Sequence, residues 1–221
     1  MSDTPIDVFI DLPSFPGPVQ AGRLWSHFRK GRESASFEYN KEWLANPHRF
    51  ALEPLLPLAD GTFHTNPGQS VFGAIGDSTP DRWGRILMRR AELARARTAN
   101  ESPHTLSELD YLLRVNDEAR QGALRFSQDG GQSFCAPPGS TPIPPLVNLS
   151  RLLHAADHFC RDDENAEDLR LLLAPGSSLG GARPKASVKD KKGNLCIAKF
   201  PRYDDEYNVV AWEAVALTLA S

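Results

Sequence analysis

The stretch "LLLAPGSSLGGARPKASVKDKKGNLCIAKFPRYDDEYNVVAWEAVAL" (171–217) contains a glycine-rich loop, two strand-like runs and a helix-like segment. In the loop "GSSLGGARPK" (176–185), glycines permit positive φ angles and bare backbone N–H groups that can bind phosphate oxygens. The loop has neither a Walker A ending nor the pattern GxGxxG. A tight helix-to-strand turn, in which the glycines only permit the bend, is therefore an equally good interpretation.

The residues after the loop favour a nucleotide site. "KASVKD" and "NLCIAKF" are strand-like, and the period of two puts Leu195, Ile197 and Lys199 on one face of the second run. A lysine there is costly to bury without an anion, although a lysine reaching to solvent explains it equally well. The helix-like "YNVVAWEAVALTLA" offers Glu213, which alone would be a surface residue. Together, a glycine loop, a strand lysine and a helix glutamate match the order in a protein kinase's small lobe.

The residues before this stretch predict a β-rich region followed by helices. Alternation predicts strands at 6–12, 18–28, 34–40 and 121–126. Apolar periodicity predicts helices at 79–99, 105–115, 148–161 and 165–174. Thr105 and Glu108 have the spacing of a capping box. The proline-rich "APPGSTPIPP" (136–145) is typical of a stiff linker.

The predicted fold class is α+β. A small β-rich N-terminal subdomain with helices is followed by the start of a protein-kinase-like small lobe. The expected division is 1–135 for the N-terminal region, 136–147 for the linker and 148–221 for the kinase-like part.

Composition and charge exclude several classes of protein. The 221 residues are 40% hydrophobic and 24% charged with a net charge of −3, which predicts a packed core and argues against a surface devoted to nucleic acid. Arginines gather at 82–97, where a solvated helix face is the simpler interpretation and a nucleic-acid site the alternative. There is no run of about 18 apolar residues, so no membrane span is predicted.

Cysteine and histidine give little sign of a metal site. Cys135, Cys160 and Cys196 form no disulfide framework and no CxxC pair. We expect Cys160 and Cys196 to be small buried hydrophobes in a reducing cytoplasm. His154 and His158 have the spacing of helical metal ligands, but no HExxH pattern or third ligand accompanies them. No metal site is predicted.

The combined motifs resemble the HipA family, the serine/threonine-protein kinase toxins of bacterial toxin–antitoxin pairs. The resemblance rests on "LLAPGSSLGGARPKASV", "LCIAKFP" and "VVAWEAVALTLA", and on "STPDRWGRILMRR", "QGALRF" and "ASFEYNKEWL" in the N-terminal half. It implies an ATP phosphate-binding loop made of Gly180, Gly181, Ala182, Arg183, Pro184 and Lys185. It also implies Lys199 as the nucleotide lysine, Glu213 as its ion-pair partner and Ser178 as the autophosphorylated serine.

The resemblance further implies ATP and Mg²⁺ as cofactors, a cytoplasmic location and no membrane partner. The expected partner is a HipB-like DNA-binding antitoxin, so that DNA is contacted only through the antitoxin. The expected substrate is a protein, and some family members phosphorylate an aminoacyl-tRNA synthetase.

The chain departs from the family in one respect. The family's catalytic residues lie in its carboxy-terminal half, and no HRDxxxxN-like stretch occurs in this sequence. "VNDEAR" (115–120) contains Asn and Asp, but it precedes the glycine loop. We therefore expect the N-terminal half of such a kinase, with no catalytic residues of its own and no activity alone. The alternative is a non-catalytic module that binds an antitoxin or a separate catalytic chain.

Overall fold

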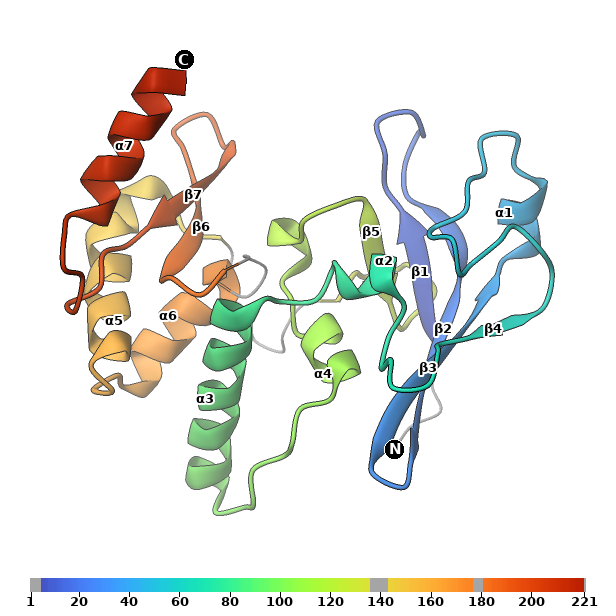
Figure 1. Ribbon diagram of the computed structural model, residues 1–221, viewed down its shortest axis with the longest axis horizontal. Coiled ribbons are helices and arrows are strands. Elements are labelled where there is room, and N and C mark those ends of the chain that lie inside the picture. Colours follow the sequence, from blue (N-terminus) through green and yellow to red (C-terminus); the bar gives the residue numbers. More distant parts are fainter. Residues whose placement is uncertain (1–4, 136–142, 177–180, 221) are drawn as a thin grey trace. The chain divides into compact units, whose positions relative to one another are not determined.

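In a computed structural model, the chain is described at residues 5–135, 143–176 and 181–220, and it contains both strands and helices (Figure 1). This confirms the predicted α+β class. The chain divides into two compact units: unit 1 is Met1–Thr79 with Thr105–Pro137, and unit 2 is Pro80–His104 with Pro138–Ser221. The division predicted from sequence is linear, so it differs from these units chiefly at residues 80–104.

Among the described residues, five antiparallel strands form the sheet of unit 1 in the order β4-β3-β2-β1-β5. They are β1 (Ile6–Ile10), β2 (Val19–Arg29), β3 (Arg32–Tyr39), β4 (Thr62–His64) and β5 (Leu124–Ser127). Val8 of β1 lies opposite Gly22 of β2 on one side and Phe126 of β5 on the other. All five residues of β1 are buried. β1, which has a neighbour on each side, is thus apolar at most positions instead of alternating.

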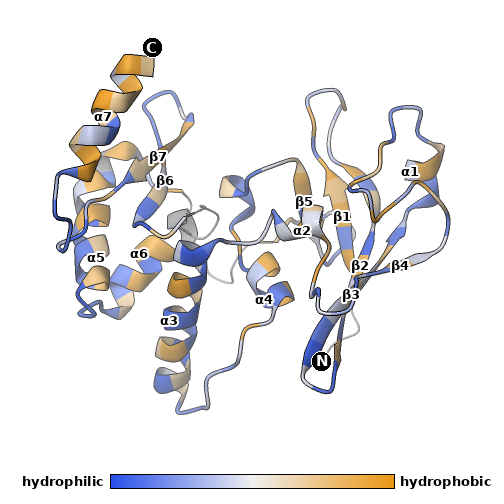
Figure 2. Ribbon diagram, viewed as in Figure 1, coloured by the Kyte–Doolittle hydropathy of each residue, from blue (hydrophilic) through white to orange (hydrophobic). Residues whose placement is uncertain are grey.

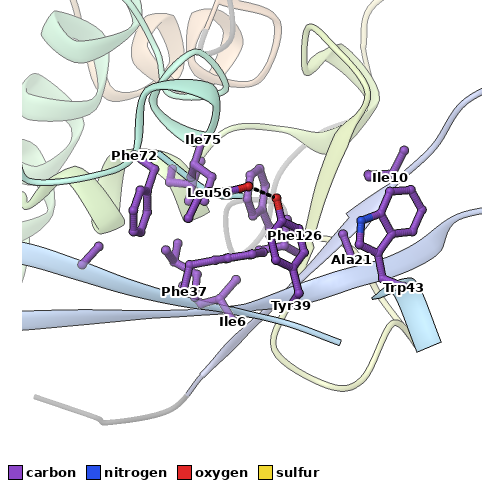
Figure 3. Packing of buried hydrophobic residues seen from close by; sticks show 14 residues of the cluster. Ile6, Ile10, Ala21, Phe37, Tyr39, Trp43, Leu56, Phe72, Ile75 and Phe126 are labelled. Carbon is purple, nitrogen blue, oxygen red and sulfur yellow. Dashed lines mark hydrogen bonds between the residues drawn. The ribbon is translucent and has the colours of Figure 1, made fainter. Parts of the chain in front are cut away.

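Aromatic side chains fill the core of unit 1 (Figure 3). Phe37 and Tyr39 of β3 meet edge to face with ring centroids 5.0 Å apart, and the Tyr39 hydroxyl donates to the Leu56 carbonyl at 2.7 Å. Gly22 of β2 lies against Phe37, where an added Cβ would stand 2.4 Å from the ring. Any larger residue at position 22 would therefore displace a core side chain.

The described part of unit 1 also contains three short helices and a 3-10 turn: α1 (Lys41–Ala45), α2 (Gly73–Gly76), α4 (Glu108–Leu113) and η1 (Asp117–Ala119). The capping box predicted at Thr105 and Glu108 is wrong by two residues. The Ser107 hydroxyl accepts the Asp110 N–H at 3.1 Å, and the Asp110 carboxylate accepts the Ser107 N–H at 2.8 Å. The predicted pair, Thr105 and Glu108, and the observed pair, Ser107 and Asp110, have the same spacing in the sequence. Glu33 of β3 accepts the Glu108 N–H at 2.9 Å, which places Glu108 in the first turn.

A buried arginine joins separate segments of unit 1. The Arg120 side chain is 2% exposed, lies 3.6 Å from the Asp117 carboxylate and covers the ring of Phe126. Its guanidinium also donates to the carbonyls of Ser78, Leu112 and Val115. Burial lowers the pKa of Arg120 to about 10, so the group is still charged at neutral pH. The "VNDEAR" stretch is therefore part of the core of unit 1.

Where the structure describes it, unit 2 contains a helical layer and one hairpin. The helices are α3 (Arg82–Ala99), η2 (Leu146–Asn148), α5 (Leu149–Cys160), α6 (Ala166–Gly176) and α7 (Val209–Ala220). The hairpin pairs β6 (Lys185–Lys189) with β7 (Leu195–Lys199). Trp83 and Leu87 of α3 join α5, α6 and β6 in one apolar core. Of the predicted linker, 136–142 lies outside the described residues, and the Pro144 carbonyl accepts the Lys189 N–H of β6 at 2.9 Å.

The two strands of the hairpin differ in burial. The middle three residues of β6 are buried, whereas four of the five residues of β7 are exposed. The expectation that Cys196 is buried is therefore wrong, since that residue is exposed. No residue of α7 is buried either, and Figure 2 shows that this helix is strongly hydrophobic. β7 and α7 thus present an apolar surface, which includes Ile197 and Trp212 at 53% and 63% exposure.

Candidate site around Lys199 and Glu213

The register of the hairpin brings two lysines together. Lys185, the first residue of β6, lies opposite Lys199, the last residue of β7. The Lys199 ammonium forms an ion pair with the Glu213 carboxylate of α7. The predicted partnership of Lys199 and Glu213 is thus present in the geometry. Their side chains are 49% and 36% exposed, so the pair contributes little to folding and stays accessible to a ligand.

Lys185 is the more enclosed of the two lysines. Partial burial lowers its pKa, and the neighbouring positive charge of Lys199 lowers it further. The carboxylates of Asp81 and Glu213 act in the opposite direction. The cluster therefore holds two ammonium groups and two carboxylates at the open end of the hairpin. An anion that replaced either carboxylate would find both lysines close by.

Among the described residues of the glycine-rich loop, Gly181 lies beside these charges. Its φ of +81° is a conformation that other residues rarely adopt, and an added Cβ would lie 2.8 Å from the Lys185 ammonium nitrogen. Its N–H donates to the Asp81 carboxylate, and its carbonyl accepts the Trp83 N–H at 3.0 Å. Both backbone polar groups of Gly181 are thus held by the start of α3.

Trp83 of α3 forms a hydrogen bond with the hairpin. Its indole N–H donates to the Lys185 carbonyl at 2.9 Å, and its ring meets Phe159 edge to face at 5.1 Å. The side chain is almost wholly buried. Sequence reasoning did not assign Asp81 or Trp83 to the site. The only available signal was that "STPDRWGRILMRR" belongs to the family resemblance, and the contacts span about 100 residues of sequence.

The remaining loop residues predicted for the site take different places. Ala182 is exposed, and Pro184 is buried with its carbonyl accepting the Phe200 N–H at 3.0 Å. Arg183 forms a two-pronged pair with Asp205 at 2.7 and 3.0 Å. Its guanidinium is therefore engaged by a carboxylate within the protein. The predicted Gly180 and Ser178 lie outside the described residues.

A comparison with protein families identifies the chain. A family model described as the HipA N-terminal domain matches residues 17–127, which is half of the 221-residue chain. The chain belongs to the HipA family. Family membership implies a HipB-type antitoxin as partner. No curated protein matches the chain.

The matched span of this HipA-family chain does not follow its structural units. It contains β2 to β5 of unit 1 and also α3, which packs in unit 2. The glycine loop, Lys199 and Glu213 all lie after residue 127. The family match therefore reaches the candidate cluster only through Asp81 and Trp83.

The two histidines with the spacing of helical metal ligands, His154 and His158, lie beside each other and near an aspartate. His158 lies 3.0 Å from the Asp168 carboxylate, and its ring lies beside that of His154. Within 5–135, 143–176 and 181–220, no group of three or more His, Cys, Asp or Glu side chains could hold a metal ion.

None of the helices in these described ranges is long and apolar enough to cross a membrane.

Several arginines of α3 have partners within unit 2. Arg90 binds the carboxylates of Glu164, at 2.7 Å, and Asp162. Arg95 pairs with Glu92 and Glu101, each at 2.8 Å. These contacts favour the interpretation of the 82–97 arginines as a paired helix face over that of a nucleic-acid site.

Proposed function

We propose that this HipA-family chain binds ATP through the cluster around Lys199, as the small lobe of a serine/threonine-protein kinase toxin. The observation that carries the proposal is the Lys199–Glu213 ion pair beside Gly181 and Lys185. In protein kinases a strand lysine holds the α- and β-phosphates, a helix glutamate holds that lysine and a glycine-rich loop covers the phosphates. The same three kinds of group meet here from β7, α7 and the loop.

The residues of the cluster fit the phosphates of a nucleotide. Lys199 supplies a point charge on an exposed strand end, and Glu213 fixes the direction of its ammonium group. Lys185 supplies a second charge from the opposite strand. Gly181 permits close approach because it has no side chain. These are binding and orienting roles, and all of them act on the phosphate groups.

We assign nucleotide binding to this chain, and phosphoryl transfer only to a protein that adds the missing catalytic groups. The sequence has no HRDxxxxN-like stretch to orient an acceptor hydroxyl. The described residues also offer no cluster of acidic ligands for Mg²⁺. Transfer of phosphate to a protein target in the cytoplasm, under control of a HipB-like antitoxin, is the wider function that we propose for the complete kinase.

A second candidate function is that of an interaction module, and the apolar surface of β7 and α7 favours it. Leu195, Ile197, Trp212, Leu217 and Leu219 are each at least half exposed. Large exposed apolar patches mark binding sites for other proteins. If the module is the whole function, the chain recovers an antitoxin or a catalytic chain in a pull-down and shows no affinity for ATP.

The experiment that tests the proposal is calorimetric titration with ATP and Mg²⁺. The wild-type chain is compared with Lys199→Ala and with Lys191→Ala, which removes the same charge from the exposed hairpin turn. We expect measurable binding that Lys199→Ala weakens at least tenfold, about 1.4 kcal/mol, and that Lys191→Ala leaves unchanged. Absence of binding by the wild type, or equal loss in both variants, would contradict the proposal.

A further inference from the structure

Asp81 occupies the position of an anion at the glycine loop. It is the N-cap of α3, and one of its carboxylate oxygens accepts the Arg82 N–H at 2.7 Å. The other oxygen accepts the N–H of Gly181. The negative charge also faces Lys185. A backbone N–H beside a lysine is the combination that a phosphate oxygen would use.

We infer that the Asp81 carboxylate is an internal competitor of phosphate, which lowers the affinity of this site for nucleotides. The inference rests on the proposed function, because it concerns the regulation of the same site. A backbone N–H carries a single hydrogen and fully serves one acceptor at a time. A phosphate oxygen can therefore bind Gly181 only after Asp81 has left or has been forced to share.

Repulsion between the Asp81 carboxylate and a phosphate adds to the effect of the Gly181 hydrogen bond that Asp81 occupies. If the carboxylate moves only slightly, it remains as a negative charge next to the phosphates, and Glu213 is already a second one in the cluster. Like charges in one site oppose each other. The hydrogen bonds from Gly181 and Arg82 lower the pKa of Asp81, so the carboxylate stays ionised at neutral pH.

The position of Asp81 also allows it to leave. The residue is exposed, so water can replace its protein partners when it turns away. Trp83 and Gly181 remain joined by their backbone hydrogen bond at 3.0 Å without Asp81. The loop therefore keeps one attachment to α3 while its N–H becomes free for a ligand. A merely structural brace would instead have to stay in place when a nucleotide binds.

The test uses Asp81→Asn, because asparagine is as good an N-cap as aspartate. Its one side-chain oxygen can still accept the Arg82 N–H, whereas the charge and the acceptor for the Gly181 N–H are both lost. Asp163→Asn removes the same charge from an exposed position of unit 2 and serves as the matched control. Asp81→Ser, a second neutral N-cap, replaces Asp81→Asn if that variant fails to fold. Binding is followed by the amide resonance of Gly181 during titration with ATP and, separately, with inorganic triphosphate.

We expect Asp81→Asn to bind both ligands at least about fivefold more tightly than the wild type, within the usual range of coupling between sites. Asp163→Asn should match the wild type. Unchanged or weaker binding by Asp81→Asn overturns the inference and shows that Asp81 only stabilises the loop. If Asp81→Asn binds triphosphate but no chain binds ATP, the competition stands and the proposed function fails. If no chain binds either ligand, both fail.

Discussion

Unit 1 and the hairpin region of unit 2 use their side chains in opposite ways. In unit 1 every residue of β1 is buried, and the cation Arg120 is 2% exposed with several carbonyl partners. In unit 2 most of β7 is exposed, and the cation Lys199 is half exposed with a single carboxylate partner. The difference indicates that the sheet of unit 1 carries stability, whereas the hairpin keeps its charged groups available for a ligand.

The comparison predicts its largest effect for an aromatic residue of unit 1. Phe37→Ala empties a wholly buried position next to Gly22 and Tyr39. We expect the free energy of unfolding of unit 1 to fall by about 4 kcal/mol, measured by urea denaturation. Phe28→Ala, at a side chain 51% exposed, is the matched control and should cost less than about 0.5 kcal/mol. Equal losses would show that burial does not distinguish the two positions.

The buried cation of unit 1 should matter next. Arg120→Ala removes one of the two arginines that pair with the buried Asp117 carboxylate, Arg125 being the other, and it takes the arginine donor away from three carbonyls. The expected loss is about 3 kcal/mol, from the three lost carbonyl hydrogen bonds at about 1 kcal/mol each. Arg29→Ala, at the exposed end of β2, should be nearly neutral in the same urea experiment. If Arg120→Ala leaves the free energy of unfolding unchanged, the contrast between the buried Arg120 and the exposed Lys199 no longer holds.

A smaller effect should follow from removing one hydrogen bond in unit 2. Trp83→Phe keeps an aromatic ring against Phe159 but deletes the indole N–H that serves the Lys185 carbonyl. An unsatisfied buried acceptor costs about 1 to 2 kcal/mol. Amide hydrogen exchange should therefore accelerate in β6 while β2 is unaffected. Acceleration in both units would show that they unfold as one.

The smallest effect on stability is expected at the candidate site itself. Lys199→Ala breaks an exposed ion pair, which should change the free energy of unfolding by less than about 0.5 kcal/mol. The same variant should lose ATP affinity, as predicted above. A large destabilisation would mean that Lys199 serves the fold, and the contrast between the units would then no longer separate stability from binding.

Local patterns predicted much of the fold. The strand predicted at 6–12 is found at Ile6–Ile10. The helices α3, α4 and α5 lie within their predicted ranges, whereas α6 runs to Gly176, beyond the predicted end at 174. The cap of α4 was misplaced because Thr105–Glu108 and Ser107–Asp110 have the same spacing. Only the contact from Glu33, distant in the sequence, distinguishes them. Local spacing could not supply that information.

The candidate site was predictable in part. The order of the loop, Lys199 and Glu213 predicted an ion pair between the last two residues, and the structure brings these two side chains together. Cys196 was wrongly expected to be buried because it stands in an apolar run, and the run itself could not show that Cys196 and most of β7 are left exposed. Asp81 was missed because its partner Gly181 lies 100 residues later in the sequence. The roles of Gly180 and Ser178 stay predictions.

The strand order of unit 1 has a consequence for synthesis on the ribosome. β1 is made long before its partner β5, which ends only at Ser127. Until then one edge of the sheet is open, and open edges of apolar strands invite pairing with other chains. Residues 80–104, which pack in the other unit, are synthesised during that interval. We therefore expect nascent chains that have not yet reached Ser127 to be the form that most needs a chaperone.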